Sequence, residues 1–158
     1  MSCGVALAVS LLLSDPNVAL AAAQPPAVAS APVSVAGEPL FVDIVTRSTT
    51  LKTMAEGWGT SGLIEQDGFL TGSAFADFKV QATALAEMDM QGHLILKARG
   101  TDGDLKCILR GISEDMPRKV LAVETATTTA ERRVALDELV YLLNDNVEVI
   151  TAPPQPEV

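Results

Sequence analysis

Two segments in which apolar and polar residues alternate flank an Asp-Gly dipeptide in the second half of the chain. Residues 93–100 precede the dipeptide and residues 104–111 follow it. Asp-Gly between alternating segments is a strong β-hairpin signal, because both residues tolerate the positive φ of a two-residue turn. The pattern predicts a hairpin over residues 93–111, with Asp102 and Gly103 at its turn.

The register of this hairpin sorts its side chains onto two faces, because side chains alternate along a strand and paired residues share a face. One face is apolar and is predicted to join the core. The other carries four cations, although the chain has 11 basic and 20 acidic residues and a formal net charge of -9. The apolar face consists of Leu94, Leu96, Ala98, Cys107 and Leu109, and the cations are Lys97, Arg99, Lys106 and Arg110.

Shorter patterns predict the elements that precede the hairpin. Residues 39–46 are rich in β-branched and aromatic side chains and predict a strand, followed by a short helix over residues 48–56. A second short hairpin is predicted around Asp67 and Gly68. Residues 73–90 fit both a strand and a helical stripe; their alanines favour a helix over residues 73–87, and the strand alternative would extend the main hairpin into a meander.

Two helices are predicted after the hairpin. The segment from Ser113 to Pro117 has the residues of a helix start, and this helix is expected to end near Ala126. Thr128 and Glu131 match a capping box, which opens a second helix that ends near Leu143. Residues 144–146 predict its end and residues 147–150 an edge strand. The predicted fold class is α+β: a small, mainly antiparallel sheet built on the 93–111 hairpin, with helices packed on its apolar face.

The two ends of the chain have simple compositions. Residues 4–13 are an apolar run that is too short to span a bilayer, and the small residues that follow fit cleavage after Ala21 or Ala23. This predicts a signal peptide over residues 1–23 and a periplasmic or secreted protein, with no stable membrane span. An uncleaved apolar leader is the alternative, because no Lys or Arg precedes Arg47. A Pro/Ala-rich linker over 24–37, one domain over 38–150 and a disordered tail over 151–158 complete the predicted organisation.

Candidate catalytic groups are few. Cys107 and His93 are the Cys and His of the predicted domain, and the hairpin register places them roughly 16 Å apart on opposite faces, too far for a thiol and its base. Cys107 is therefore predicted to be a core residue. Trp58, between two glycines, is interpreted as an indole on the domain edge rather than a platform for stacking a ligand.

The acidic residues give no motif of known spacing. Asp102, Asp104 and nearby Asp89 suggest a carboxylate site for a divalent cation, but Asp-Gly and Gly-Asp are typical of turns and the spacing lacks the pattern of a calcium loop, so the turn interpretation is preferred. The sequence has no phosphate-binding loop, dinucleotide fingerprint or zinc motif, so no cofactor and no metal are predicted. A small hydrolase that uses dispersed carboxylates is the alternative function; its candidates are Glu65, Asp67, Asp102 and Asp104.

The four cations are the candidate binding site. They either pair with acidic residues of the same molecule or hold an anionic partner, such as an acidic glycan, phospholipid headgroups or an acidic protein. The acidic net charge argues against nucleic acid as the partner. The sequence thus predicts an exported, non-enzymatic binding or structural module of the cell envelope.

Overall fold

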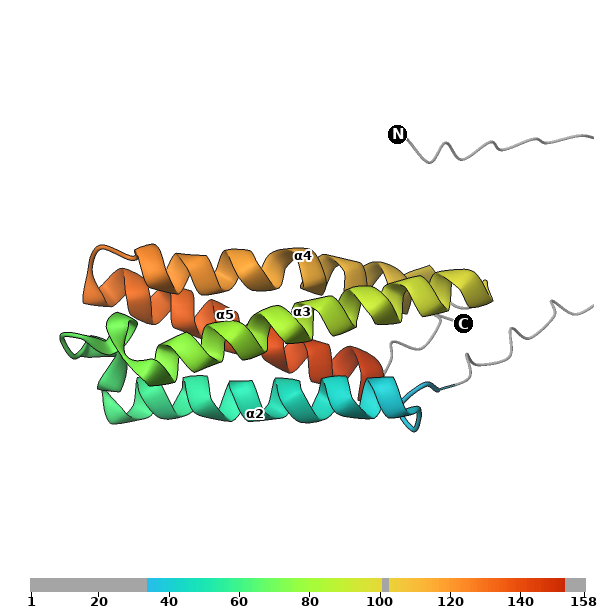
Figure 1. Cartoon of the computed structure of the whole chain (residues 1–158), viewed down its shortest axis with the longest axis horizontal. Helices are drawn as coiled ribbons and strands as arrows, with labels where there is room; N and C mark the ends of the chain where they lie inside the picture. The colour runs from blue at the N-terminus through green and yellow to red at the C-terminus, as the bar shows by residue number, and fades with distance from the viewer. Residues whose placement is uncertain (1–33, 101–102, 153–158) are drawn as a thin grey trace, which may run out of the picture. The chain divides into compact units, whose positions relative to one another are not determined.

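The computed structural model describes residues 34–100 and 103–152, and these residues form four long α-helices (Figure 1). Consecutive helices are joined by short connections and run antiparallel. Helices α2 and α4 each pack on both α3 and α5, so the four helices surround one core as an up-and-down bundle. Their bounds are Pro39–Ser61 (α2), Ser73–Arg99 (α3), Gly103–Thr125 (α4) and Thr129–Thr151 (α5), and two short 3-10 helices, Leu63–Glu65 (η1) and Phe69–Thr71 (η2), connect α2 to α3.

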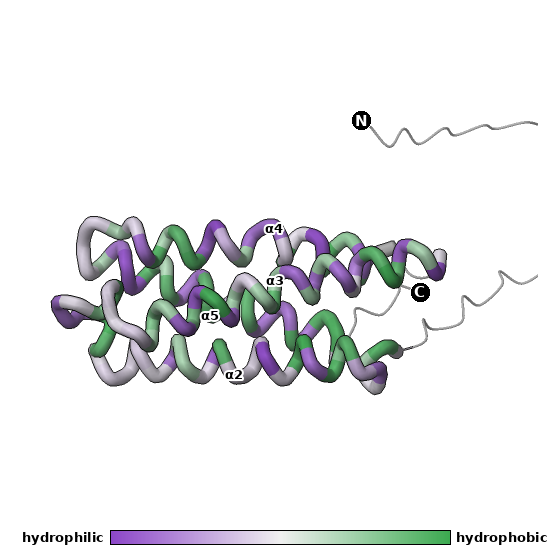
Figure 2. The backbone as a smooth tube through the Cα atoms, viewed as in Figure 1, coloured by the Kyte–Doolittle hydropathy of each residue, from purple (hydrophilic) through white to green (hydrophobic). Residues whose placement is uncertain are grey.

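The core consists of aliphatic and aromatic side chains that recur at intervals of three and four residues. This interval keeps one stripe of each helix turned towards its neighbours. Figure 2 shows the resulting alternation of hydrophobic and hydrophilic stretches along each helix. The buried members are Phe41, Ile44, Leu51, Ala55 and Trp58 on α2, Phe75, Phe78, Ala82, Leu85 and Leu96 on α3, Leu105, Leu109, Ile112, Met116, Val120 and Val123 on α4, and Leu136, Leu139, Leu143 and Ile150 on α5.

The predicted α+β fold is wrong, because the described residues contain no strand. Residues 93–99 are the end of α3, and residues 103–111 are the start of α4. Gly103 opens α4, so this part of the chain connects two helices rather than two strands. Leu96, Leu105 and Leu109 are buried at helical intervals, and the core stripe that includes Leu96 begins as far back as Phe75. A long helical stripe thus outweighs a short alternation that also fits a strand.

The predicted strand over residues 39–46 is also wrong, because these residues form the first two turns of α2. Its proline lies at the start of the helix, where a missing N–H removes no helical hydrogen bond. The second predicted hairpin is replaced by η1 and η2, and Gly68 adopts a left-handed conformation between them, with φ 85. The helix predicted over residues 73–87 is confirmed and continues to Arg99.

The C-terminal helices are confirmed, with different bounds. In the capping box of α5, the Glu131 N–H donates to Thr128 Oγ1 at 3.2 Å, and the Thr128 N–H donates to the Glu131 carboxylate at 3.1 Å. Helix α5 continues through Asn146 to Thr151, so the edge strand over residues 147–150 is wrong. Helix α4 begins at Gly103 rather than near Ser113, and Pro117 therefore lies inside it.

The predicted signal peptide over residues 1–23 lies outside the described residues, as does most of the predicted linker. The described end of the linker forms a turn in which the Glu38 N–H donates to the Val35 carbonyl oxygen at 2.9 Å. Val35 is buried against the bundle core. At the other end, α5 includes Thr151, the first residue of the predicted tail. Among the described residues, no helix combines the length and the apolar character needed to cross a membrane.

Candidate functional site

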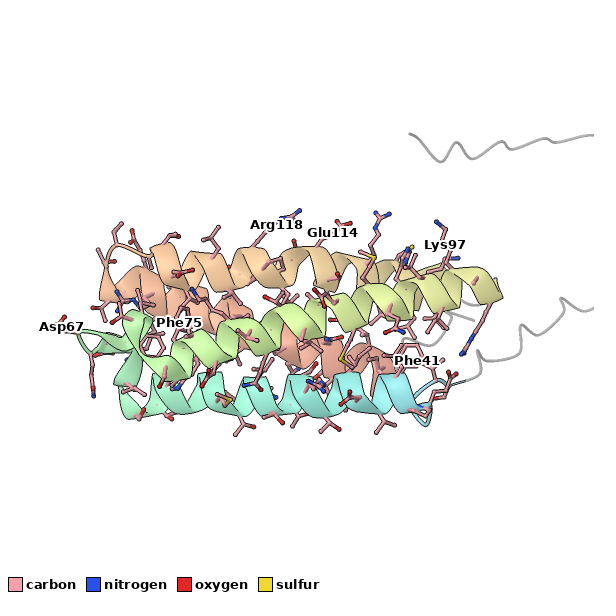
Figure 3. The ribbon with its side chains drawn as sticks, in the orientation of Figure 1. Phe41, Asp67, Phe75, Lys97, Glu114 and Arg118 are labelled. Atoms are coloured by element: carbon pink, nitrogen blue, oxygen red, sulfur yellow. The ribbon has the colours of Figure 1, made fainter. Side chains whose placement is uncertain are left out.

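The four predicted cations lie at the end of the bundle where α3 is followed by α4. Lys97 and Arg99 belong to the last turn of α3, and Lys106 and Arg110 to the first turns of α4. Lys97 is labelled at this end in Figure 3. We call these four residues the basic end. The prediction of one shared β face is wrong, because the cations lie on two helices.

Two cations of the basic end pair with carboxylates. Arg99 donates to both oxygens of the Glu38 carboxylate at 2.7 Å, which ties the end of α3 to the residue before α2. These hydrogen bonds lower the pKa of Glu38 below its usual value. Arg110 Nε lies 3.5 Å from Glu114 Oε1, and both side chains are largely exposed, so this pair is weak.

The two lysines of the basic end differ from the arginines. Lys97 and Lys106 make no ion pair with any residue that the structure describes. Lys97 is exposed, and Lys106 is half-buried. Lys106 also lies in the first turn of α4, where the helix dipole disfavours a cation. The basic end therefore keeps positive charge that direct pairing with the described carboxylates does not neutralise.

A second candidate site, absent from the sequence predictions, lies in the bundle core. Ser48 of α2, Asp89 of α3 and Asn146 of α5 are each 0% exposed. Each occupies a position of its helix's core stripe, which is otherwise apolar on α2 and α5 and holds one further polar residue, His93, on α3. We call these three residues the polar layer. Three separate helices thus meet in the core through polar side chains.

The polar layer is connected by hydrogen bonds but is incompletely paired. The Asn146 amide Nδ2 donates to Ser48 Oγ at 3.1 Å and to Asp89 Oδ2 at 3.0 Å. Asp89 Oδ1 and Asn146 Oδ1 are buried and have no hydrogen-bond partner among the described atoms. Both atoms are acceptors when the carboxyl is ionised. The hydrogen bonds of the polar layer thus leave two buried acceptors without a partner among the described atoms.

The environment of Asp89 favours its neutral form. Burial raises the pKa of its carboxyl to about 7, and the hydrogen bond from Asn146 opposes this shift only in part. Removing a carboxylate from water disfavours its charge unless a cation or enough donors replace the solvent. Among the described residues, only the side-chain amide of Asn146 donates to the Asp89 carboxyl.

His93 lies one turn after Asp89 on α3 and fastens α3 to α4. Its side chain is 8% exposed, and Nδ1 donates to the Lys106 carbonyl oxygen at 2.6 Å. Because a carbonyl oxygen only accepts, the proton of the neutral ring is on Nδ1. The Lys106 carbonyl group is bonded to the backbone nitrogen of Cys107, so the His93 ring lies beside the backbone of Cys107. The wide separation predicted for these two residues is therefore wrong. The prediction that Cys107 is a core residue is also wrong, because it is exposed.

The interpretation of Trp58 as an edge residue is wrong. Its side chain is 7% exposed and packs in an aromatic cluster at the end of the bundle opposite the basic end. The ring centroid of Trp58 lies 5.1 Å from that of Phe69, 6.2 Å from that of Phe75 and 4.9 Å from that of Phe78. The buried residues of α2 recur every three or four positions from Phe41 to Trp58, and this helical interval is the sequence signal that Trp58 faces the core.

Among the described carboxylates of the alternative hydrolase, the structure separates Asp104 from Glu65 and Asp67. Glu65 pairs with Arg133 beside η1, and Asp67 lies at the same end of the bundle (Figure 3). Asp104 lies in the first turn of α4, at the basic end. Helix α3 alone, with 27 residues at about 1.5 Å each, separates these ends by tens of ångströms. Asp102 lies outside the described residues.

The other cavities of the described structure offer fewer groups that could bind or react with a ligand. A cavity of about 250 Å³ beside η2 is lined by Arg132, whose Nη1 donates to the Ile64 carbonyl oxygen at 2.9 Å. Arg132 Nε has no hydrogen-bond partner among the described atoms, but it is out of contact with solvent, so a ligand in the cavity does not reach it. A groove of about 500 Å³ between α4 and α5 is lined largely by alanines. In the described ranges, no three His, Cys, Asp or Glu residues gather as metal ligands would.

Comparisons with protein-family models, with curated proteins and with solved structures found no match. The basic end and the polar layer therefore stand on their own geometry. The sequence predictions named every member of the basic end but missed Ser48 and Asn146. The interruption of an apolar core stripe by a polar residue is the signal that identifies them.

Proposed function

We propose that this chain is an exported, non-enzymatic bundle module of the cell envelope that contacts an anionic partner through its basic end. The observation that carries the proposal is the presence of Lys97 and Lys106 at one end of the bundle without a carboxylate partner among the described residues. In a chain with a net charge of -9, such a cluster attracts anions in one orientation and repels them elsewhere.

The separation of Asp104 from Glu65 and Asp67 supports a binding role over a hydrolase that would use all three carboxylates. A pair of catalytic carboxyls in glycosidases lies within about 10 Å. Glu65 and Asp67 are at one end of the bundle and Asp104 is at the other. Asp104 therefore does not share a cleft with Glu65 or Asp67 in this fold.

The binding proposal predicts the behaviour of a triple variant, Lys97→Gln, Lys106→Gln and Arg110→Gln. Each basic residue at an anionic membrane surface contributes about 1 kcal/mol to binding. Because the variant loses three of them, its affinity for phosphatidylglycerol vesicles should fall on the order of 100-fold. Cosedimentation with phosphatidylglycerol vesicles, and titration with an acidic polysaccharide, measure the loss. Wild-type binding should also weaken from 50 to 300 mM salt, because screening shortens the range of these charges.

A control variant changes the net charge equally at cations that are already paired. Arg47→Gln, Lys79→Gln and Arg118→Gln remove partners of Asp43, Glu124 and Asp115 on three helices. This variant should bind like the wild type. Equal losses in both variants would attribute binding to net charge alone, and no binding of the wild type to either anion would refute the proposed role.

Export predicts a shortened chain in the native cell. The apolar run over residues 4–13 and the small residues after it support cleavage after Ala21 or Ala23. Mass spectrometry of the protein from the native cell should therefore find an N-terminus at Ala22 or Gln24. Recovery of the chain with Met1 from the soluble cytoplasm would contradict export, and an intact chain in the membrane fraction would support the uncleaved leader.

A further inference from the structure

The polar layer has a structural cost that an apolar layer would not have. Two of its oxygen atoms are buried without a donor, and an unpaired buried acceptor costs about 1–3 kcal/mol. These positions lie on the core stripes of α2, α3 and α5, whose other buried side chains are mostly apolar. A polar layer retained at this cost needs an explanation.

A proton on Asp89 would add a hydrogen-bond donor to a layer in which two acceptors are unpaired. A protonated carboxyl adds an O–H donor, whereas an ionised one only accepts. The Asn146 amide already donates to Asp89 Oδ2, and Asn146 Oδ1 is the acceptor left unpaired in the same layer. Protonation thus removes the buried charge and turns one of the two unpaired acceptors into a donor.

We propose that the polar layer of Ser48, Asp89 and Asn146 is a pH-sensitive element, which holds α2, α3 and α5 together while Asp89 carries a proton and loosens them when the proton is lost. The element goes beyond anion binding at the basic end and depends on none of those cations. An exported protein meets the pH of its surroundings, to which such an element responds.

The ionisable groups around Asp89 do not replace the proton as its partner. On α3, His93 is engaged with the Lys106 carbonyl oxygen. On α2, Lys52 Nζ donates to Asn144 Oδ1 of α5 at 2.6 Å and lies 3.9 Å from Glu56.

The remaining neighbours lie on α5 and α4. Asp145 and Glu148 of α5 are both acidic, so neither stabilises an anionic Asp89. On α4, which contacts α3 through Leu109, the exposed Arg110 and Glu114 pair with each other. No described cation therefore offsets the charge of ionised Asp89.

The direction of the pH effect follows from the two states of the chain. In the unfolded chain, Asp89 loses its proton near pH 4, whereas burial raises the pKa of Asp89 in the bundle to about 7. Between these values the folded state binds a proton that the unfolded state lacks. Stability from this group is therefore full below about pH 4, and the unfolding constant rises about tenfold per pH unit until about pH 7.

The test compares the purified wild-type chain with Asp89→Asn, which has the same shape but does not titrate. Urea unfolding, followed by Trp58 fluorescence between pH 4 and 9, should show the tenfold rise per pH unit in the wild type relative to the variant. The variant should unfold at higher urea than the wild type at pH 8. Asp137→Asn, which changes an exposed carboxyl of α5, should keep the wild-type pH dependence.

Two further measurements on the wild type keep the proposal falsifiable if Asp89→Asn does not fold. The ¹³C signal of the Asp89 carboxyl should titrate near pH 7, and a midpoint near 4 would overturn the proposal. At pH 8.5, backbone amides of α5 near Asn146 should exchange faster, relative to their intrinsic rates, than at pH 5. Equal protection at both pH values would show that Asp89 titrates without loosening the bundle and would also overturn the proposal.

Discussion

Phe78→Ala should lower the free energy of unfolding by about 3–5 kcal/mol, the usual effect of removing a fully buried aromatic ring from a core. Phe78 is 0% exposed, and its ring centroid lies 4.9 Å from that of Trp58. The loss therefore combines removal of apolar area with a cavity beside the indole. Urea unfolding measured by far-UV circular dichroism gives the change in stability.

Trp58 provides a local measurement in the same experiment. It is the one tryptophan of the chain, so the emission maximum reports the aromatic cluster. In folded Phe78→Ala the maximum should move to longer wavelength, because the indole loses a buried neighbour. Val80→Ala, two residues away on the same helix and 71% exposed in the native protein, should change stability by less than about 0.5 kcal/mol. Similar stabilities for the two variants would contradict the burial of Phe78.

Gly92→Leu should lower the free energy of unfolding by about 3 kcal/mol, the upper part of the usual range for overpacking a core. A Cβ at Gly92 would lie 3.2 Å from Leu109 Cδ1 and 3.3 Å from Phe41 Cε1, before any larger side chain is added. Leucine brings three more carbon atoms into this contact between α2, α3 and α4. Its better helix propensity, worth about 1 kcal/mol, does not offset that.

Gly111→Ala is the matched control for this helix effect. Gly111 lies within α4, and a Cβ there meets no atom within 4 Å. Alanine should therefore raise the free energy of unfolding by about 0.5–1 kcal/mol through helix propensity alone. Chemical denaturation should show a lower free energy of unfolding for Gly92→Leu and a higher one for Gly111→Ala. Gly92→Leu with wild-type stability would show that α3 does not approach α2 and α4 as closely as the structure places it.

A helix start that is defined by specific hydrogen bonds could be predicted from the sequence. The capping box at Thr128 has one geometry in which both of its residues find partners, so its residue types fix the start of α5. The hairpin prediction failed because a few alternating residues fit more than one element. Residues 93–99 extend a stripe of buried residues that begins at Phe75, and packing along its whole length decides their conformation.

The candidate sites show the same limit. The four cations could be named from the sequence because charge is a property of the residue type, but their placement on one β face was wrong, since they belong to the ends of two helices. The polar layer was not predicted, because Ser48 and Asn146 are 98 residues apart and are ordinary polar residues until the bundle brings them to 3.1 Å. Asn146 was even assigned to a helix end, a role that its residue type favours in isolated sequence.

The composition of the polar layer also has a consequence for the order of folding. Helices α3 and α4 are joined by a short connection and can associate early, since contacts between neighbours in sequence carry a small loop entropy. Asn146 must instead meet Asp89 across 57 residues and Ser48 across 98. During synthesis α5 leaves the ribosome last, so a nascent chain presents Asp89 to water until Asn146 arrives. Completion of the hydrogen bonds to Asn146 is therefore expected to accompany a late step, the docking of α5 against α2.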